Sequence, residues 1–150
     1  MKAQNEMKIT LLSRSCNESF ARVAVAAFVA QLDPTVDEIN DIKTAVSEAV
    51  TNCIVHAYRN ALGPIYLTVG IYDGGKIRIK VRDTGCGIED IDRAMEPLFT
   101  TAGGERAGLG FAVMQSFMDG VRVRSTPGKG TTVSLTKTLS LRARGAERRD

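Results

Sequence analysis

Glu48 and Asn52 lie four positions apart in the stretch EAVTNCIVHA, which carries a carboxylate, an amide and the imidazole of His56 among apolar residues. The surrounding pattern predicts a long helix from Thr35 to about Tyr58, and residues at i and i+4 share one flank of a helix. That flank lies roughly 110–150° from the apolar stripe at 100° per residue. The pair is therefore either an ordinary solvated flank, which is common, or two polar groups that act on one ligand.

A second candidate group follows a predicted strand. Asp83 ends the strictly alternating segment Lys76–Asp83, and Thr84-Gly85-Cys86-Gly87 comes directly after it. A carboxylate at a strand end can accept a hydrogen bond from a ligand, and glycines allow the backbone to approach that ligand closely. A simple turn that contains Asp and Gly explains this segment equally well when it is taken by itself.

A third group, Gly108-Leu109-Gly110-Phe111, is expected to open the last helix. The N–H groups at a helix N-terminus can bind anions such as phosphate. A G-x-G pattern alone is weak evidence, because it is frequent. The combination is more specific: E-x-x-x-N on a helix, D-x-G-x-G after a strand, and G-x-G-F at a helix start. The sequence contains no P-loop and no protein-kinase catalytic loop that would offer another nucleotide site.

These three segments, in this order, resemble the GHKL family of ATP-binding domains, and the resemblance covers about residues 8–138. It implies a site for ATP and Mg²⁺ between the long helix and a lid. Asn52 would be the Mg²⁺ ligand, and Asp83 would accept a hydrogen bond from the adenine amino group. The remaining nucleotide contacts that the resemblance implies are Gly85, Gly87, Gly108, Gly110 and Thr131.

The stretch NESFARVAVAAFVAQLDPTVDE, with EAVTNCIVHAY and EPLFTT, resembles bacterial anti-sigma factors that are also serine kinases, above all those of sporulation. The resemblance implies a homodimer that binds and inhibits a sigma factor of RNA polymerase. It also implies phosphorylation of a serine on an anti-anti-sigma protein, which otherwise displaces the sigma factor. Arg22 and Thr51 would be partner-contact positions, although a solvated helix arginine is the more common state of a residue such as Arg22.

Within this resemblance, Glu48 is expected to be the general base toward the serine hydroxyl, because phosphoryl transfer needs a group that orients the nucleophile. Arg106 in the lid would contact the γ-phosphate, since a guanidinium suits phosphate oxygens. Two alternatives stay open: a general-stress anti-sigma kinase with another sigma partner, and an ATP-gated binding module without useful kinase activity. Glu48 favours an enzyme, because binding alone needs Asn52 and Asp83 but no base.

The elements that must position these groups are predicted from periodicity and capping patterns. Ser15-x-x-Glu18 and Thr35-x-x-Glu38 are capping-box patterns that precede a helix at 17–31 and the long helix. A short helix at 89–95, a loop at 100–110 and a helix at Phe111–Met118 follow. Strands are expected at Met7–Leu12, Ile65–Tyr72, Lys76–Asp83, Val121–Ser125 and Thr131–Thr138. This order predicts an α+β fold, a two-layer sandwich with helices on one face of a mainly antiparallel sheet.

Composition and charge limit the class of protein. The 150 residues fit one domain at 1–139, and we expect a disordered basic tail at 140–150. The tail holds +2 of the net charge of +3, so the domain is nearly neutral and we expect no direct binding of nucleic acid. The sequence has no long apolar run and no CxxC pair, so we expect no membrane insertion and a cytoplasmic location.

Overall fold

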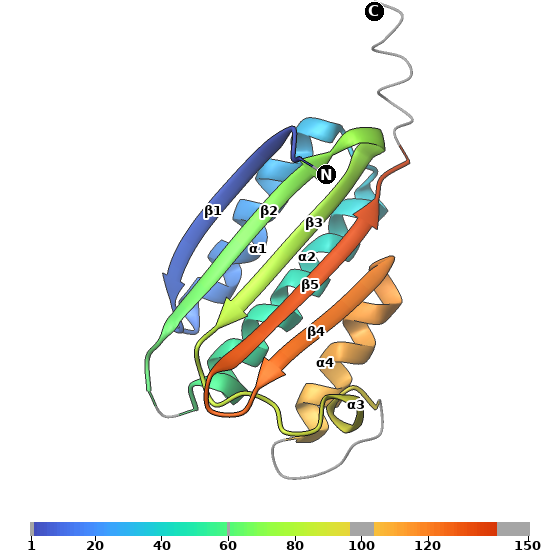
Figure 1. Ribbon diagram of the computed structural model, residues 1–150. Helices are drawn as coiled ribbons and strands as arrows, with labels where there is room; N and C mark the ends of the chain where they lie inside the picture. Colours follow the sequence, from blue (N-terminus) through green and yellow to red (C-terminus); the bar gives the residue numbers. More distant parts are fainter. Residues whose placement is uncertain (1, 60, 97–103, 141–150) are drawn as a thin grey trace, which may run out of the picture.

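The computed structural model describes residues 2–59, 61–96 and 104–140, with the backbone alone for 104–109. Within these ranges, five strands form one antiparallel sheet in the order β1-β2-β3-β5-β4. Figure 1 shows the long helices together on one side of this sheet. The strands are β1 (Asn5–Leu12), β2 (Pro64–Tyr72), β3 (Lys76–Asp83), β4 (Gly120–Thr126) and β5 (Gly130–Thr138). The predicted two-layer α+β sandwich is confirmed.

The sheet has one buried face and one solvated face. On β3, Ile77, Ile79 and Val81 are buried, whereas the alternate residues Lys80 and Arg82 are exposed. This alternation follows from the pleat of a strand, which sends successive side chains to opposite faces. The turn η3 (Asp73–Gly75) joins β2 to β3, at the position where the sequence Asp-Gly-Gly predicts a hairpin. The apolar face packs against the helices and forms the core.

The helical layer begins with α1 (Cys16–Val29) and the 3₁₀ turn η1 (Ala30–Leu32). Next comes α2 (Val36–Asn52), which continues as the π-helical turn η2 (Cys53–Ala57). A single-turn helix, α3 (Ile91–Ala94), and α4 (Gly104–Phe117) complete the layer. The predicted apolar stripe is confirmed along most of its length, because five members are almost fully buried: Ile42, Val46, Ala49, Val50 and, at the start of η2, Cys53. Its two end members, Ile39 and Ala57, are only half-buried.

The two predicted capping boxes have different outcomes. At α2 the box forms, because the Thr35 side chain accepts a hydrogen bond from the Glu38 amide and the Glu38 carboxylate accepts one from the Thr35 amide. At α1 the prediction was wrong, because Ser15 makes no side-chain cap. Ser15 has helical backbone angles (φ −58°, ψ −32°), whereas an N-cap residue needs an extended conformation. The Glu18 carboxylate is instead bonded to Ser47 and paired with Arg22.

The start of α4 also differs from the prediction. A loop was expected at 100–110 because of its glycines, but the structure continues helix α4 back to Gly104, and 97–103 lie outside the described residues. Two glycines each cost about 1 kcal/mol in a helix interior, so their number argues against helix. Packing outweighs this cost, since Phe111, Met114 and Met118 at the other end of the helix are buried against the core.

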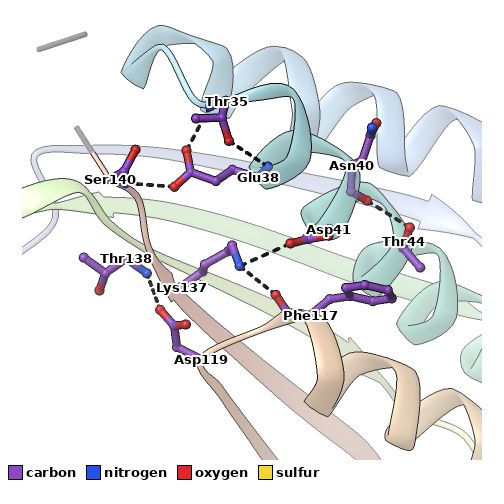
Figure 2. Close-up of polar contacts among 10 residues, drawn as sticks. All are labelled: Thr35, Glu38, Asn40, Asp41, Thr44, Phe117, Asp119, Lys137, Thr138 and Ser140. Carbon is purple, nitrogen blue, oxygen red and sulfur yellow. Dashed lines mark hydrogen bonds and ion pairs between the residues drawn. The ribbon is translucent and has the colours of Figure 1, made fainter. Parts of the chain in front are cut away.

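The last residues of β5 are attached to the start of α2 by polar contacts (Figure 2). Lys137 Nζ lies 3.7 Å from the Asp41 carboxylate and donates a hydrogen bond to the Phe117 carbonyl. The Ser140 amide donates to the second carboxylate oxygen of Glu38 at 2.8 Å. Ser140, which was predicted as the first residue of a disordered tail, is therefore held by α2, and 141–150 lie outside the described residues.

Candidate functional site

A cavity of about 550 Å³ opens between the end of α2, the segment that follows β3, and β5. Its polar lining includes Asn52, Asp83 and Thr131, which come from three different elements. Further polar and charged residues also line it: His56, Arg59, Glu89, Asp90 and Arg93. The apolar part of its wall consists of Ala49, Ile88, Ala94, Phe111 and Val133. A cavity that combines an apolar wall with convergent polar groups is typical of a small-molecule site, and here it suits a flat heterocycle with a polar edge.

Asp83 lies at the inner end of the cavity and is only 5% exposed. Its Oδ1 accepts hydrogen bonds from the amides of Gly85 (2.9 Å) and Thr131 (3.2 Å), so the side chain is fixed from both sides. Burial raises the pKa of the carboxyl above its ordinary value, and the hydrogen bonds oppose that rise. The arrangement gives a fixed carboxylate whose second oxygen, Oδ2, has no backbone N–H partner among the described contacts.

Cys53 reaches that second oxygen, and sequence analysis did not anticipate the contact. Its thiol lies 3.6 Å from Asp83 Oδ2 in a geometry that allows S–H to donate. Burial and the neighbouring carboxylate raise the pKa of the thiol well above its ordinary value, so the thiol keeps its proton. Cys53 belongs to the core stripe, and no sequence signal distinguishes a core cysteine from one that also contacts a site residue.

The two glycines after Asp83 have different roles. Gly87 lines the cavity and has a φ of +76°, a conformation that favours glycine. Gly85 is not among the cavity-lining residues, contrary to its expected place beside the base. A Cβ at Gly85 would collide with the Ala57 carbonyl, so this glycine permits close contact between the β3 end and η2. The Cys86 amide donates to the same carbonyl at 3.1 Å.

Glu48, Asn52 and Gly110 meet at the contact between α2 and α4. A Cβ placed on Gly110 would lie 3.2 Å from Glu48 Oε1 and 3.4 Å from Asn52 Oδ1, so both side chains approach the same point of α4. Asn52 Nδ2 is buried and has no hydrogen-bond partner among the residues that the structure describes. A buried donor without a partner is costly, which points to a ligand at this position. The i,i+4 pair is therefore not an ordinary solvated flank.

The other predicted site residues do not belong to the cluster of Glu48, Asn52 and Gly110, and the side chains of some are not among those that the structure describes. Thr131 is buried, lines the cavity, and its hydroxyl lies 2.8 Å from that of Ser125. Gly108 and Arg106 belong to the backbone of α4, not to a loop, and the side chain of Arg106 is not among those described. Arg22 on α1 pairs with Glu18 at 3.2 Å, and Thr51 on α2 is half-buried; neither lines the cavity.

A helix must be both long and apolar to cross a membrane. In the ranges that the structure describes, none is both long enough and apolar enough to cross a bilayer.

Comparison with known proteins gives a consistent result. The family model of the histidine kinase-like ATPase domain matches residues 15–137. The anti-sigma F factor of Caldanaerobacter subterraneus subsp. tengcongensis is 62% identical over 138 residues, which are 91% of this chain and 96% of that protein. The anti-sigma F factor of Bacillus licheniformis is 52% identical over 139 residues, covering 91% and 94% of the two chains.

Solved structures agree on the fold. The RsbU and RsbW domains of Rv1364c from Mycobacterium tuberculosis match with a TM-score of 0.68 and 23% identity, over 91% of this chain and 32% of that one. Full-length ShkA, solved in complex with AMPPNP, matches with a TM-score of 0.54 and 25% identity, over 67% of this chain and 22% of that one. The family match and the identity over nearly the whole length lead to one conclusion: the chain belongs to the anti-sigma F factor family and carries a histidine kinase-like ATPase domain.

Proposed function

We propose that this protein binds and inhibits a sporulation sigma factor of RNA polymerase, and that it is an ATP-dependent serine kinase. Its phosphoacceptor is a serine on an anti-anti-sigma protein, and phosphorylation inactivates that antagonist. The observation that carries the proposal is the meeting of Glu48, Asn52 and Gly110 beside a cavity with a buried carboxylate, Asp83, at its inner end. A carboxylate that can accept a proton thus lies next to the groups that suit a nucleotide.

The residues present fit ATP and Mg²⁺. Asp83 Oδ2 would be the acceptor for the adenine amino group, and Thr131 and Gly87, which line the cavity, would border the base. The unpartnered Asn52 amide supplies one oxygen for a cation and one N–H donor for a phosphate oxygen. Mg²⁺, when bound, neutralises charge on the phosphate oxygens. Gly110, which has no Cβ, permits the close approach of α4 to Glu48 and Asn52, and with Gly108 it would border the phosphates. Arg106 would be the residue that supplies a guanidinium for the γ-phosphate, as the family resemblance implies.

Glu48 acts as the general base. Its carboxylate accepts the proton of the serine hydroxyl as the oxygen attacks, and such a base contributes about 10²–10⁴-fold in rate. Asn52, one helical turn on, orients the phosphate end of the substrate. The i,i+4 spacing allows one rigid helix to hold both groups, so their separation does not change when partners bind.

The proposed partners contact other parts of the molecule. The protein acts as a homodimer in the cytoplasm, with Arg22 on α1 and Thr51 on α2 in the partner-contact surface. The Arg22 side chain is about 40% exposed despite its pairing with Glu18, so part of it is accessible to a partner. A second candidate, the general-stress anti-sigma kinase, is favoured by the RsbW domain among the structural neighbours, but the closer identity to anti-sigma F factors supports the sporulation form.

Two variants one helical turn apart test the proposal. Glu48→Gln should bind Mg-ATP and the sigma factor normally but lose at least about 10²-fold in phosphorylation of the antagonist. Asn52→Ala should weaken Mg-ATP binding and therefore reduce both activities. Calorimetry with Mg-ATP, sigma-factor pull-down and transfer of a radiolabelled γ-phosphate measure the three quantities. Phosphorylation at the wild-type rate by Glu48→Gln would remove Glu48 as the base and favour an ATP-gated binding module.

A further inference from the structure

The face of the sheet that points away from the helices is strongly basic. Strand register places three cations in one row across the sheet, where they alternate with hydroxyl residues: Lys8, Thr68, Lys80, Ser134 and Arg122. The adjacent row contains Tyr66, Arg82, Thr132 and Arg124. In all, the strands bring seven basic residues to this basic sheet face: Lys8, Lys76, Arg78, Lys80, Arg82, Arg122 and Arg124.

Almost no acidic charge offsets these cations. Among the described strand residues on the basic sheet face, one is acidic: Glu6, which pairs with Lys8 at 3.7 Å. The whole chain has a net charge of only +3, so the rest of the molecule is net negative. From the nearly neutral net charge of the domain, the sequence predicted no binding of nucleic acid. That net charge conceals a separation of charge between the two sides of the sheet. A basic face of this kind is an electrostatic footprint for a polyanion.

The basic sheet face also contains a groove of about 450 Å³. Cations on β1 and β3 line it, Lys8, Lys80 and Arg82, and the hydroxyl groups of Thr10, Thr68 and Thr132 lie between them. These side chains supply hydrogen-bond donors beside positive charge, which is the combination that binds phosphate oxygens. Two arginines are held in place by aromatic rings: Arg82 lies 4.0 Å from the centroid of Tyr66, and Arg78 lies 5.5 Å from that of Tyr72.

From these features we propose that the basic sheet face binds the phosphate backbone of a nucleic acid. A protein partner would need exposed apolar or aromatic anchors for a stable interface. Of the exposed large apolar side chains in the described residues, Leu12 alone belongs to a strand, and it lies at a corner of the face. Nucleic acid needs no such anchor, because its affinity comes from neutralised phosphates. The tyrosine rings are covered by guanidinium groups, so contact with the backbone is favoured over stacking of bases.

This site is separate from the proposed nucleotide site. The cavity beside Asn52 and Asp83 lies between the sheet and the helices, whereas the basic sheet face is on the opposite side of the same sheet. Lys80 and Arg122 are exposed and have no part in the proposed kinase chemistry. Nucleic-acid binding and kinase activity can therefore be measured independently, and loss of one activity should leave the other intact.

The test uses the full chain and fluorescence anisotropy with a labelled oligothymidylate and with a labelled duplex of mixed sequence. We expect a Kd on the order of 10⁻⁵ M at physiological salt for at least one of the two, with log K falling linearly as log salt rises. Lys80→Glu with Arg122→Glu should weaken binding at least about tenfold and reduce the salt slope by about one to two units.

Arg14→Glu with Lys43→Glu is the matched control, because it makes the same change in net charge on the helical side of the molecule. This control should reduce binding less than threefold, and all variants should keep the wild-type melting temperature and Mg-ATP affinity. A deletion of 141–150 distinguishes the basic tail from the sheet. Equal losses in the two charge-reversal variants, loss only on deletion of the tail, or absence of binding to both oligonucleotides would each overturn the proposal. Binding of labelled polyglutamate, with no binding of either oligonucleotide, would overturn the proposal and assign the face to an acidic polypeptide instead.

Discussion

Asp83 combines two demands that conflict at the scale of one residue. Burial raises the pKa of its carboxyl, and hydrogen bonds from Gly85 and Thr131 and the Cys53 thiol oppose the rise. Because the folded pKa lies above the unfolded value, the ionised group costs stability at neutral pH. That cost is absent below the unfolded pKa, near 3.8, and is complete once the pH exceeds the raised folded value. A site residue retained at such a cost is typical of function.

Asp83→Asn should therefore separate binding from stability. The amide places an N–H where the adenine amino group needs an acceptor, so ATP affinity should fall more than about tenfold. The melting temperature should stay the same or rise, since the neutral side chain removes the buried charge. Calorimetry with Mg-ATP and thermal unfolding measure the two effects. Wild-type affinity in a folded variant would exclude Asp83 from the nucleotide site.

Gly110 offers a test of how closely α4 must approach the pair on α2. In Gly110→Ala the new methyl group would lie 3.2 Å from Glu48 Oε1, and the carboxylate must move to accommodate it. A misplaced catalytic group costs about ten- to a hundredfold in rate. Ala also favours the helix by about 1 kcal/mol, so the fold should not be weakened. Ser116→Ala on the exposed side of α4 is the control; equal phosphorylation rates in both variants would contradict the proposed proximity.

At the scale of an element, Glu38 joins the start of α2 to Ser140, which follows β5 and Leu139. Burial alone would raise its pKa, but hydrogen bonds from the amides of Thr35 and Ser140, the Thr35 hydroxyl contact and the charge of Lys137 outweigh this and lower it below the ordinary value of 4.5. The stabilisation is therefore present above pH 4.5 and is lost as the pH falls through the lower, folded value. The carboxylate both caps a helix and fastens the end of the sheet.

Removal of this carboxylate should destabilise the fold in a pH-dependent way. Glu38→Ala should lower the free energy of unfolding by about 1–2 kcal/mol at pH 7, because it removes both acceptor oxygens. Glu38→Gln should lower it by less, because the amide oxygen still replaces one of the two acceptors. Denaturant titrations at pH 7 and at pH 3 should show the difference from wild type shrinking on acidification. Asp37→Ala, in the same helical turn but exposed, is the control. A difference that is independent of pH would show that the ionised form of Glu38 is unimportant.

At the scale of the whole molecule, the ordered chain reaches the residues beyond β5. Leu139 is buried and its amide donates to the Gly75 carbonyl at 3.0 Å, and Ser140 bonds to Glu38. Deletion of 141–150 should leave the melting temperature and ATP affinity unchanged, because that segment has few apolar residues. Deletion of 139–150 should cost about 2–3 kcal/mol, since a buried leucine is removed. A large drop in melting temperature for the shorter deletion would show that the tail docks on the domain.

Sequence predicted most of the fold because its signals are local. Alternation on β3, the apolar stripe on α2 and the capping box at Thr35 each depend on neighbouring residues, and the structure bears out all three. The errors occur where local signals compete with packing. The glycines of α4 suggest a loop and the residues around Ser15 suggest a capping box, but tertiary contacts extend the helix to Gly104 and engage Glu18 elsewhere.

The chain by itself determined which residues are candidates for chemistry: Glu48, Asn52 and Asp83 stand out by type and spacing. Only the tertiary structure decided how they are arranged, because the distance from α2 to α4 and the burial of Asp83 depend on packing between segments far apart in sequence. The contact of Cys53 with Asp83 and the place of Gly85 against Ala57 follow from that packing. The basic sheet face arises in the same way: strand pairing collects cations from three strands onto one surface, which the net charge of a linear chain cannot reveal.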